Sequence, residues 1–435
     1  MIDLTNQMSY RIGSLDVQNQ KISYQMSTGK KLENGSDDAV LYGKVVNIET
    51  NLRTYEGLKT QIEKTTAQNT VADGAVDEVK KVLDTIKVDL LKSLNSGMTR
   101  PDRVAVAKNV EGMRENLLSL MNTQVDDEFI FSGSNTTVPT YEKDADFKIN
   151  GQVDFKGNSH LRNIAVEPNV YRERGITATD VMMYNTDTTA VDETISFTQR
   201  ETVVDEYGNT WKLADIDIDN ADGDDDITTG TDGVKLFKYK EDGSLSKYAD
   251  SAGVLHPEYL DVTATAVPGG QTIYTSETLS DANAANPKHI SDKTASGLLL
   301  EAKHNVFDDL NIMINALYGY STKQTDDPTT NGQKDAVIDD ESVRQILSNT
   351  LELMSNQFDA TNIAHAELGG RNRIFESSLE RVNSKVTHYN ILMQETNGAD
   401  MAKLAMESKS LELTYNALYS TVSKMNQLSL VNFLK

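Results

Sequence analysis

The chain has 435 residues, a formal net charge of −24, 38% hydrophobic residues and no cysteine. Negative charge of this size repels phosphate groups, so the composition disfavours broad binding to nucleic acid or to an anionic membrane. The lack of cysteine excludes disulfides, thiolate metal sites and cysteine nucleophiles. The first 20 residues lack the basic start and apolar run of a cleaved signal, and no later run reaches the roughly 20 apolar residues of a membrane helix. We therefore expect neither feature.

Two amphipathic stripes mark the extreme ends of the chain. A helix pair of this size has little core of its own, so it would gain stability by packing against neighbouring copies. We predict that residues 1–36 and 397–435 form a terminal coiled-coil domain whose stripes are the assembly interface. A pair packed only within its own subunit is the alternative. The predicted interface consists of Met8, Ile12, Leu15, Ile22 and Met26, with Leu404, Leu411, Tyr415, Leu418, Val422, Met425 and Leu428.

A polar loop follows the N-terminal stripe. Asn34-Gly35 favours a tight turn. Ser36 or Asp37 can cap the next helix by accepting hydrogen bonds from its free N–H groups, and the acidic pair favours the positive end of a helix. We interpret this loop as a fold signal and not as a catalytic carboxylate pair.

Heptad-spaced apolar residues predict long helices on both sides of the middle of the chain. The longest seam, residues 343–393, corresponds to a helix of about 76 Å. Gly369-Gly370 interrupts it, which either a close helix contact or tolerated slack would explain. We predict a mainly α, elongated antiparallel helical bundle built from 37–140 and 295–396. The seams cover residues 45–62 with 76–90, then 106–120, 306–317 and 343–393.

The middle of the chain has a different texture. Together with Pro139 at their edge, residues 141–294 hold five of the seven prolines, and they carry 29 acidic against 14 basic residues. Because proline breaks helices, we predict a β-rich inserted domain there. Its clearest predicted strands are 147–155, 233–239 and 271–274.

The inventory of reactive residues argues against an enzyme. The six histidines are scattered, and His365 lies on the longest seam, where we expect a packed core residue. The acidic run 215–226 lacks the glycine and glutamate of a calcium loop, so a solvated loop is the better interpretation. Gly29-Lys30 lacks the first glycine and the Ser or Thr of a phosphate loop. We predict no catalytic, cofactor or metal site.

Several of these segments carry a resemblance to a known family. Residues 20–39, QKISYQMSTGKKLENGSDDA, resemble the N-terminal signature of the flagellin superfamily. Residues 368–374, 399–402 and 425–434 are similar to its C-terminal signature. Residues 127–134, DEFIFSGS, followed by Pro139, resemble the FlgL type of hook-associated protein. The family-motif positions are Gly29, Lys30, Asn34, Ser36, Asp37, Asp38, Arg371, Asn372, Asn426 and Phe433.

The resemblance implies a non-enzymatic structural subunit of the extracellular bacterial flagellum, secreted and assembled at the hook-filament junction. Its implied partners are further copies of itself, the other hook-associated protein of the junction, flagellin, an export chaperone and the flagellar type III export apparatus. Residues 141–294 would face outward. A filament-forming flagellin is one alternative, and a surface adhesin acting through the insertion is another. An exposed Trp211 would support the adhesin.

Overall fold

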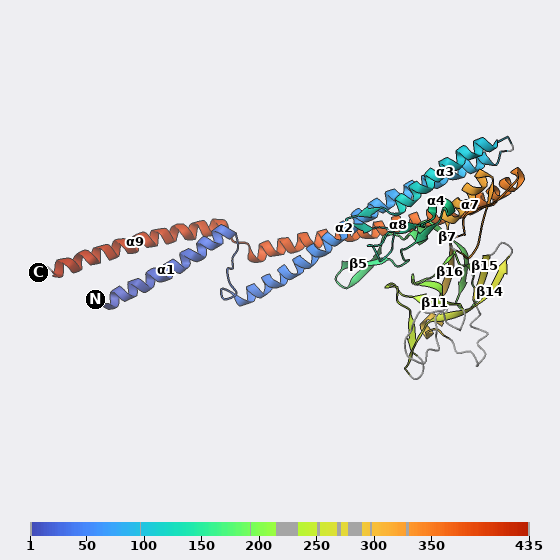
Figure 1. The fold of residues 1–435 in the computed structure, drawn as a ribbon. Coiled ribbons are helices and arrows are strands. Elements are labelled where there is room, and N and C mark those ends of the chain that lie inside the picture. Colours follow the sequence, from blue (N-terminus) through green and yellow to red (C-terminus); the bar gives the residue numbers. More distant parts are fainter. Residues whose placement is uncertain are drawn as a thin grey trace. The chain divides into compact units, whose positions relative to one another are not determined.

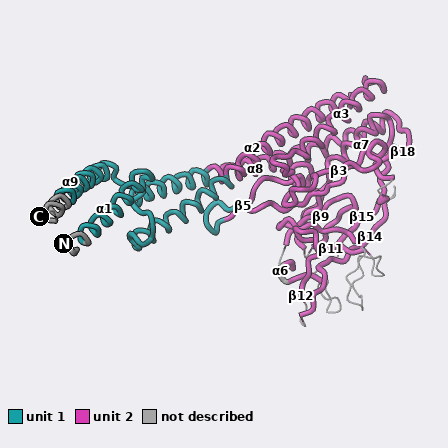
Figure 2. The backbone as a smooth tube through the Cα atoms, turned by 60° about the vertical axis from the view of Figure 1, so that its left-hand side comes forward, with its two compact units in different colours: residues 1–62, 165–170, 377–435 teal, residues 63–164, 171–376 magenta. Residues whose placement is uncertain are grey.

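The computed structural model describes residues 2–433 apart from 96, 192, 215–233, 250–252, 268–270, 277–288, 296–297 and 328–329. Side chains are described for this set except those of residues 2–6, 292–293 and 425–433. The chain divides into two compact units, 1–62 with 165–170 and 377–435, and 63–164 with 171–376 (Figure 2). None of the described helices combines the length and apolar character of a membrane span.

The first unit is built from helices of both chain ends. Helix α1 (Ile2–Thr28) and helix α9 (Met401–Phe433) lie side by side (Figure 1). The unit also contains the beginning of α2 (Ala39–Ser93) and the end of α8 (Asp340–Asn397), where the rings of Tyr55 and Tyr389 stack at 5.6 Å. The turn between β5 (Arg162–Glu167) and β6 (Val170–Arg174) completes it.

The second unit has a helical half in which the remainders of α2 and α8 run antiparallel. Helix α3 (Arg100–Met121) begins at a capping box of Thr99 and Asp102 and packs against α7 (Val306–Tyr318). The predicted mainly helical fold with paired chain ends and a β-rich body is confirmed. The buried seam residues are Val76, Val79, Leu83, Ile86, Leu90, Val110, Leu117, Leu310, Met313, Leu317, Val343, Leu347, Met354 and Leu368.

The β-rich half of the second unit is one antiparallel sheet of eight strands with the order β7-β16-β9-β10-β11-β14-β15-β8. Its edges approach each other, because Ser196 N of β8 donates to Asp187 Oδ2 of β7 at 2.8 Å. The curled sheet encloses a core that includes Trp211, Leu236 and Leu300. The strands are β7 (Met183–Ala190), β16 (Leu299–Asn305), β9 (Thr202–Asp205), β10 (Thr210–Ala214), β11 (Lys235–Tyr239), β14 (Tyr259–Val267), β15 (Gln271–Ser276) and β8 (Ser196–Thr198).

Short hairpins and single-turn helices link these parts. The hairpin strands are β1 (Gln124–Val125) with β2 (Glu128–Phe129), β3 (Tyr141–Lys143) with β4 (Val153–Phe155), β12 (Lys247–Ala249) with β13 (Leu255–Pro257), and β17 (Tyr320–Thr322) with β18 (Lys334–Val337). The short helices are α4 (Phe147–Asn150), α5 (Ala178–Val181) and α6 (Asp292–Ala295).

The predicted strand at 271–274 is confirmed within β15, and that at 233–239 is confirmed from residue 235 as β11, with residue 233 outside the described residues. The predicted strand at 147–155 is wrong in its first half. That segment forms α4, turns at Gly151 with a φ of +68°, and only then enters β4. A Cβ at Gly151 would lie 2.1 Å from Asn311 Oδ1, so only glycine fits this turn. Strand β16 lies inside the sheet although it follows residue 294, the predicted end of the inserted domain.

Two further expectations concern α8. A Cβ built on Gly369 or Gly370 would meet nothing within 4 Å, so tolerated slack explains this pair and a close helix contact does not. His365 is half-buried instead of packed in the apolar core, because its Nε2 lies 3.1 Å from Asp73 Oδ1 of α2. The heptad position therefore holds a polar link between the two helices.

Candidate assembly surface on the terminal helices

The seam between α1 and α9 uses residues of the predicted stripes. Ile22, Leu404 and Leu411 are buried, and Leu15 and Tyr415 pack against them. These positions recur at four- and seven-residue spacing, so each helix presents one continuous apolar face to the other. Five of the predicted interface residues therefore contact one another within one subunit, and the role of the stripes in assembly stays a prediction.

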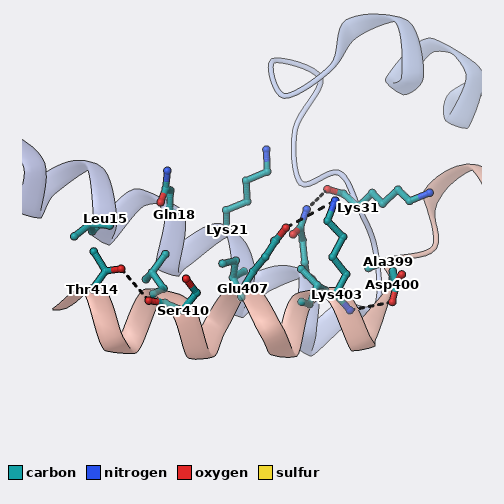
Figure 3. A pocket seen from close by; sticks show the side chains of 14 residues that line it. Leu15, Gln18, Lys21, Lys31, Ala399, Asp400, Lys403, Glu407, Ser410 and Thr414 are labelled. Carbon is teal, nitrogen blue, oxygen red and sulfur yellow. Dashed lines mark hydrogen bonds and ion pairs between the residues drawn. The ribbon is translucent and has the colours of Figure 1, made fainter. Parts of the chain in front are cut away.

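Grooves lie along this seam. The larger has a volume of about 640 Å³, and the side chains around it include Gln18 and Lys21 of α1 with Lys403 and Glu407 of α9 (Figure 3). The second has a volume of about 350 Å³ and is lined by Met8 and Leu418 together with polar neighbours. Apolar seam residues therefore remain partly accessible between the helices.

Each terminal helix also carries an exposed apolar pair on its side away from the seam, and sequence analysis missed both pairs. Met406 and Leu413 are 67% and 62% exposed, and Tyr10 and Val17 are 81% and 66% exposed. Met406 and Leu413 each follow a seam leucine by two residues, which at 3.6 residues per turn places them on the opposite side of α9. We call these four residues, two on the outward side of each helix, the outer face. The seven-residue spacing within each pair was the signal that could have revealed it.

The helix pair is closed by a backbone joint at the family-motif positions Gly29 and Lys30. Gly29 ends α1 with a φ of +69°, and Lys30 pairs with Gly398 as an antiparallel bridge. Ala399 N donates to Gly29 O at 2.8 Å, and Lys31 N donates to Asn397 O at 2.7 Å. The backbone before α2 is therefore bonded directly to the backbone before α9.

The loop after this joint corrects the predicted helix cap. Asp38 Oδ1 accepts from Leu41 N at 2.9 Å, so Asp38 caps α2, and the prediction of Ser36 or Asp37 is wrong. Asp37 instead folds back to accept from Glu33 N and Asn34 N, each at 3.2 Å, which delays the helix by one residue. The hydrogen bond from Asn34 N–H, followed by that from Lys21, holds the pKa of Asp37 below its usual value.

The remaining predicted positions are spread over the molecule. Ile12, Met8, Leu418 and Val422 are half-buried, whereas Met26, Lys30, Asn34 and Ser36 are exposed. Arg371 Nη1 donates to Gly175 O at 3.0 Å, and the neighbouring Asn372 is half-buried. The side chains of Met425, Asn426, Leu428 and Phe433 lie outside the described residues.

Residues 127–134 form a compact polar and apolar turn in the second unit. Glu128 pairs with Arg162 at 2.9 Å and with Lys64 at 3.3 Å, while Phe131 is fully buried. Gly133 has a φ of +78°, and a Cβ there would lie 2.2 Å from Asn158 Oδ1. The segment that resembles the FlgL type thus has structural reasons for its acidic, aromatic and glycine positions.

Within the described residues, no group of three or more His, Asp or Glu could hold a metal ion, and the acidic run 215–226 lies outside that set. Trp211 is 2% exposed, so it is a core residue of the sheet.

On α9, the hydrogen bond from the Tyr415 hydroxyl to Asp16 raises the pKa of Tyr415 to about 12. Tyr415 therefore stays neutral at physiological pH and links the two terminal helices.

Residues 3–136 match the family model of the bacterial flagellin N-terminal helical region. This match covers the N-terminal part of the chain and agrees with the resemblance of both chain ends to the flagellin superfamily signatures. The chain is also similar to flagellar hook-associated protein 3 of Escherichia coli, with 24% identity over 146 residues, which cover 31% of this chain and 43% of that protein. The same protein of Salmonella typhimurium is 23% identical over 124 residues, covering 28% of this chain and 39% of that protein. The chain thus matches about two fifths of the length of these curated relatives.

Solved structures give similar matches. FlgL of Xanthomonas campestris has a TM-score of 0.41 at 15% identity, covering 77% of this chain and 99% of that one. Hook-associated protein 3 of Legionella pneumophila has a TM-score of 0.45 at 13% identity, covering 81% and 98%. The curated relatives are named as hook-associated proteins and not as enzymes, in agreement with the prediction of a structural protein.

Proposed function

We propose that this protein is a structural subunit of the extracellular bacterial flagellum at the junction between hook and filament. The observation that carries the proposal is the outer face, which stays in water after the two terminal helices have paired. Because the chain is similar to hook-associated protein 3, we expect neighbouring subunits of a flagellum to cover that face.

The outer face differs from ordinary surface leucines in its arrangement. Its four large apolar side chains follow the two helices in heptad spacing and are more than 60% exposed. A soluble monomer rarely leaves such a pattern uncovered. The seam holds the pair together, and the outer face is available to neighbouring subunits, including further copies of this chain.

The finer assignments follow from the same proposal. The protein contacts flagellin on one side and the other hook-associated protein of the junction on the other, after passing an export chaperone and the flagellar type III export apparatus. The predicted interface residues Met8, Leu418 and Val422, which are only half-buried in the subunit, contribute to these contacts. Residues 1–36 with 397–435 act as the assembly domain, 37–140 with 295–396 as the bundle, and 141–294 as the outward body.

The alternative of a surface adhesin loses its main support, because Trp211 is buried in the sheet. The alternative of a filament-forming flagellin differs in copy number and location. Electron microscopy of a deletion strain separates it from the junction subunit. Loss of the junction subunit leaves hooks without filaments and flagellin in the medium.

The outer face is tested by complementing that strain with Leu413→Asp. Burying a leucine contributes about 2 kcal/mol, and a charge in the contact costs several more, repeated in every subunit. We expect the variant to be secreted but unassembled, with unchanged helicity as a purified monomer. The control Ser423→Asp adds the same charge at an exposed polar position of α9 and should assemble. Normal filaments with Leu413→Asp would refute the outer face as an assembly surface, and loss of secretion would assign it to export.

A further inference from the structure

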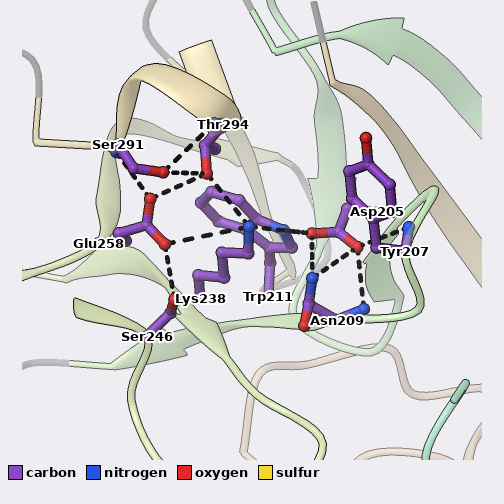
Figure 4. A network of polar contacts seen from close by, with 9 residues as sticks. All are labelled: Asp205, Tyr207, Asn209, Trp211, Lys238, Ser246, Glu258, Ser291 and Thr294. Carbon is purple, nitrogen blue, oxygen red and sulfur yellow. Dashed lines mark hydrogen bonds and ion pairs between the residues drawn. The ribbon is translucent and has the colours of Figure 1, made fainter. Parts of the chain in front are cut away.

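The β-rich sheet contains a buried lysine that contacts two buried carboxylates. Lys238 of β11, Asp205 at the end of β9 and Glu258 before β14 are each less than 10% exposed. Lys238 Nζ lies 3.4 Å from Asp205 Oδ2 and 4.0 Å from Glu258 Oε2 (Figure 4). Buried charges of this kind are expensive to retain, so their arrangement calls for a chemical explanation.

One oxygen of the Asp205 carboxyl group accepts three hydrogen bonds. Its Oδ1 accepts from Tyr207 N at 3.0 Å, from Asn209 N at 2.9 Å and from Asn209 Nδ2 at 3.0 Å. Its Oδ2 is the oxygen that faces Lys238. Three N–H donors converging on one oxygen form the environment that stabilises the oxyanion of a tetrahedral intermediate.

Glu258 is placed to carry protons. Burial raises its pKa, but hydrogen bonds from Ser246, Ser291 and Thr294 outweigh burial, and the net pKa lies below the usual value. Glu258 is therefore ionised. Thr294 Oγ1 accepts from Lys238 Nζ at 3.2 Å and donates to Glu258 Oε1 at 2.8 Å, so hydrogen bonds connect the ammonium to this carboxylate. The Trp211 ring lies beside the lysine, with its centroid 5.6 Å from Nζ.

We propose that Lys238 and Asp205 condense to an intramolecular isopeptide bond, with Glu258 as the proton carrier. The Nζ lone pair forms a bond to Asp205 Cγ, and the C–Oδ1 electrons move onto Oδ1. Collapse of this intermediate breaks the bond from Cγ to Oδ2, which leaves as water. Of the three ammonium protons one stays on the amide nitrogen and two leave with the water through Glu258, which ends unchanged. No oxidant or other reactant is needed.

The bond would join β9 to β11 across β10, because Trp211 of β10 pairs with Val203 on one side and with Lys238 on the other. A chain without cysteine has no disulfide to brace its sheet, and this condensation supplies a covalent brace from ordinary side chains. The reacting groups meet only after the strands have paired, so the unfolded chain remains uncrosslinked.

The test is the intact mass of the purified full chain, denatured before measurement. We expect a mass lower than that of the sequence by one water, and a tryptic digest in which residues 201–212 are joined to residues 236–240 at an uncleaved Lys238. A wild-type mass equal to the sequence mass would overturn the proposal and leave the three groups as an ion pair.

Two comparisons make the assignment specific. The variant Glu258→Gln should restore the full mass, since the amide cannot accept the first proton, and loss of water by this variant would refute the role of Glu258. Lys235 is the internal control. It pairs with Asp261 at 2.6 Å between β11 and β14, but both side chains are more exposed and no further carboxylate pairs with this lysine in the described part of the chain. A cross-link at Lys235 would contradict the proposal, because condensation would then not require a buried cluster with a second carboxylate.

Discussion

His304 provides a pH-dependent test of how the sheet is attached to the helical half of the second unit. It lies near the end of β16, where its Nε2 is 3.2 Å from Asp309 Oδ1 of α7 and its Nδ1 is 3.9 Å from Glu201 Oε1. Burial lowers the pKa of His304, but the hydrogen bond and charge of Asp309, with the charges of Asp308 and Glu201, raise it to about 9. The imidazolium is therefore the stable form in the folded protein.

The direction of the pH dependence of stability follows from the higher pKa of His304 in the folded state. The contribution to stability is complete below the unfolded pKa of 6.5 and is lost as the pH rises through about 9. At about 1.4 kcal/mol per pKa unit, the full difference corresponds to about 3 kcal/mol. Because the side chain keeps 21% exposure, solvent screening reduces this, and we expect a loss of about 2 kcal/mol between pH 7 and pH 10.

The assay is urea unfolding followed by the fluorescence of Trp211, the single tryptophan of the chain, which is buried in the same sheet. The variant His304→Gln cannot gain a charge, so it should be less stable at pH 7 and lose little more by pH 10. Tyr184 donates to Asp309 Oδ2 at 3.1 Å, and burial raises its pKa, so it stays neutral over this range. Parallel losses in wild type and variant would refute the assignment to His304.

Three further sets of substitutions test other parts of the fold. Leu404→Ala should destabilise the α1 and α9 pair by about 2–3 kcal/mol, seen as faster amide exchange confined to the terminal helices; unchanged exchange would contradict the seam. Gly369→Ala and Gly370→Ala should each raise the free energy of unfolding by up to about 1 kcal/mol, since the added methyl meets open space, and a lower melting temperature would show a hidden contact. Asp38→Ala should cost about 1 kcal/mol and Ser36→Ala close to nothing; equal effects in urea unfolding would contradict the assigned cap.

The helices could be predicted from the sequence because their burial pattern is local. A residue such as Leu347 or Leu368 is buried through a repeat visible within two turns, so the heptad seams located α2, α3, α7 and α8. The strand predicted at 147–155 failed for the opposite reason. Its apolar alternation is real, but the position of Gly151 against Asn311, far away in the chain, decides that the first half becomes a helical turn.

The candidate sites show the same limit. The seam of the terminal helices was visible as stripes, whereas the outer face was missed because its members lie off those stripes. The cluster of Asp205, Lys238 and Glu258 has no local pattern at all, since the four strands β9, β10, β11 and β14 must pair before its members meet. Assignment of the α2 cap missed by one residue because it depended on where the Asp37 side chain turns.

The joint between Lys30 and Gly398 fixes how the two terminal helices can vary in length. Moving outward from this bridge, first Ile22 and then Leu15 of α1 enter the apolar cluster. On α9, first Leu404 and then Leu411 enter the same cluster, so the bridge sets the register of both helices along the seam. Inserting one residue into α1 between the joint and the seam would rotate everything beyond it by about 100° and turn its apolar face away from α9. Residues can be added or removed at the free tips without disturbing this register, and near the joint only when both helices change together.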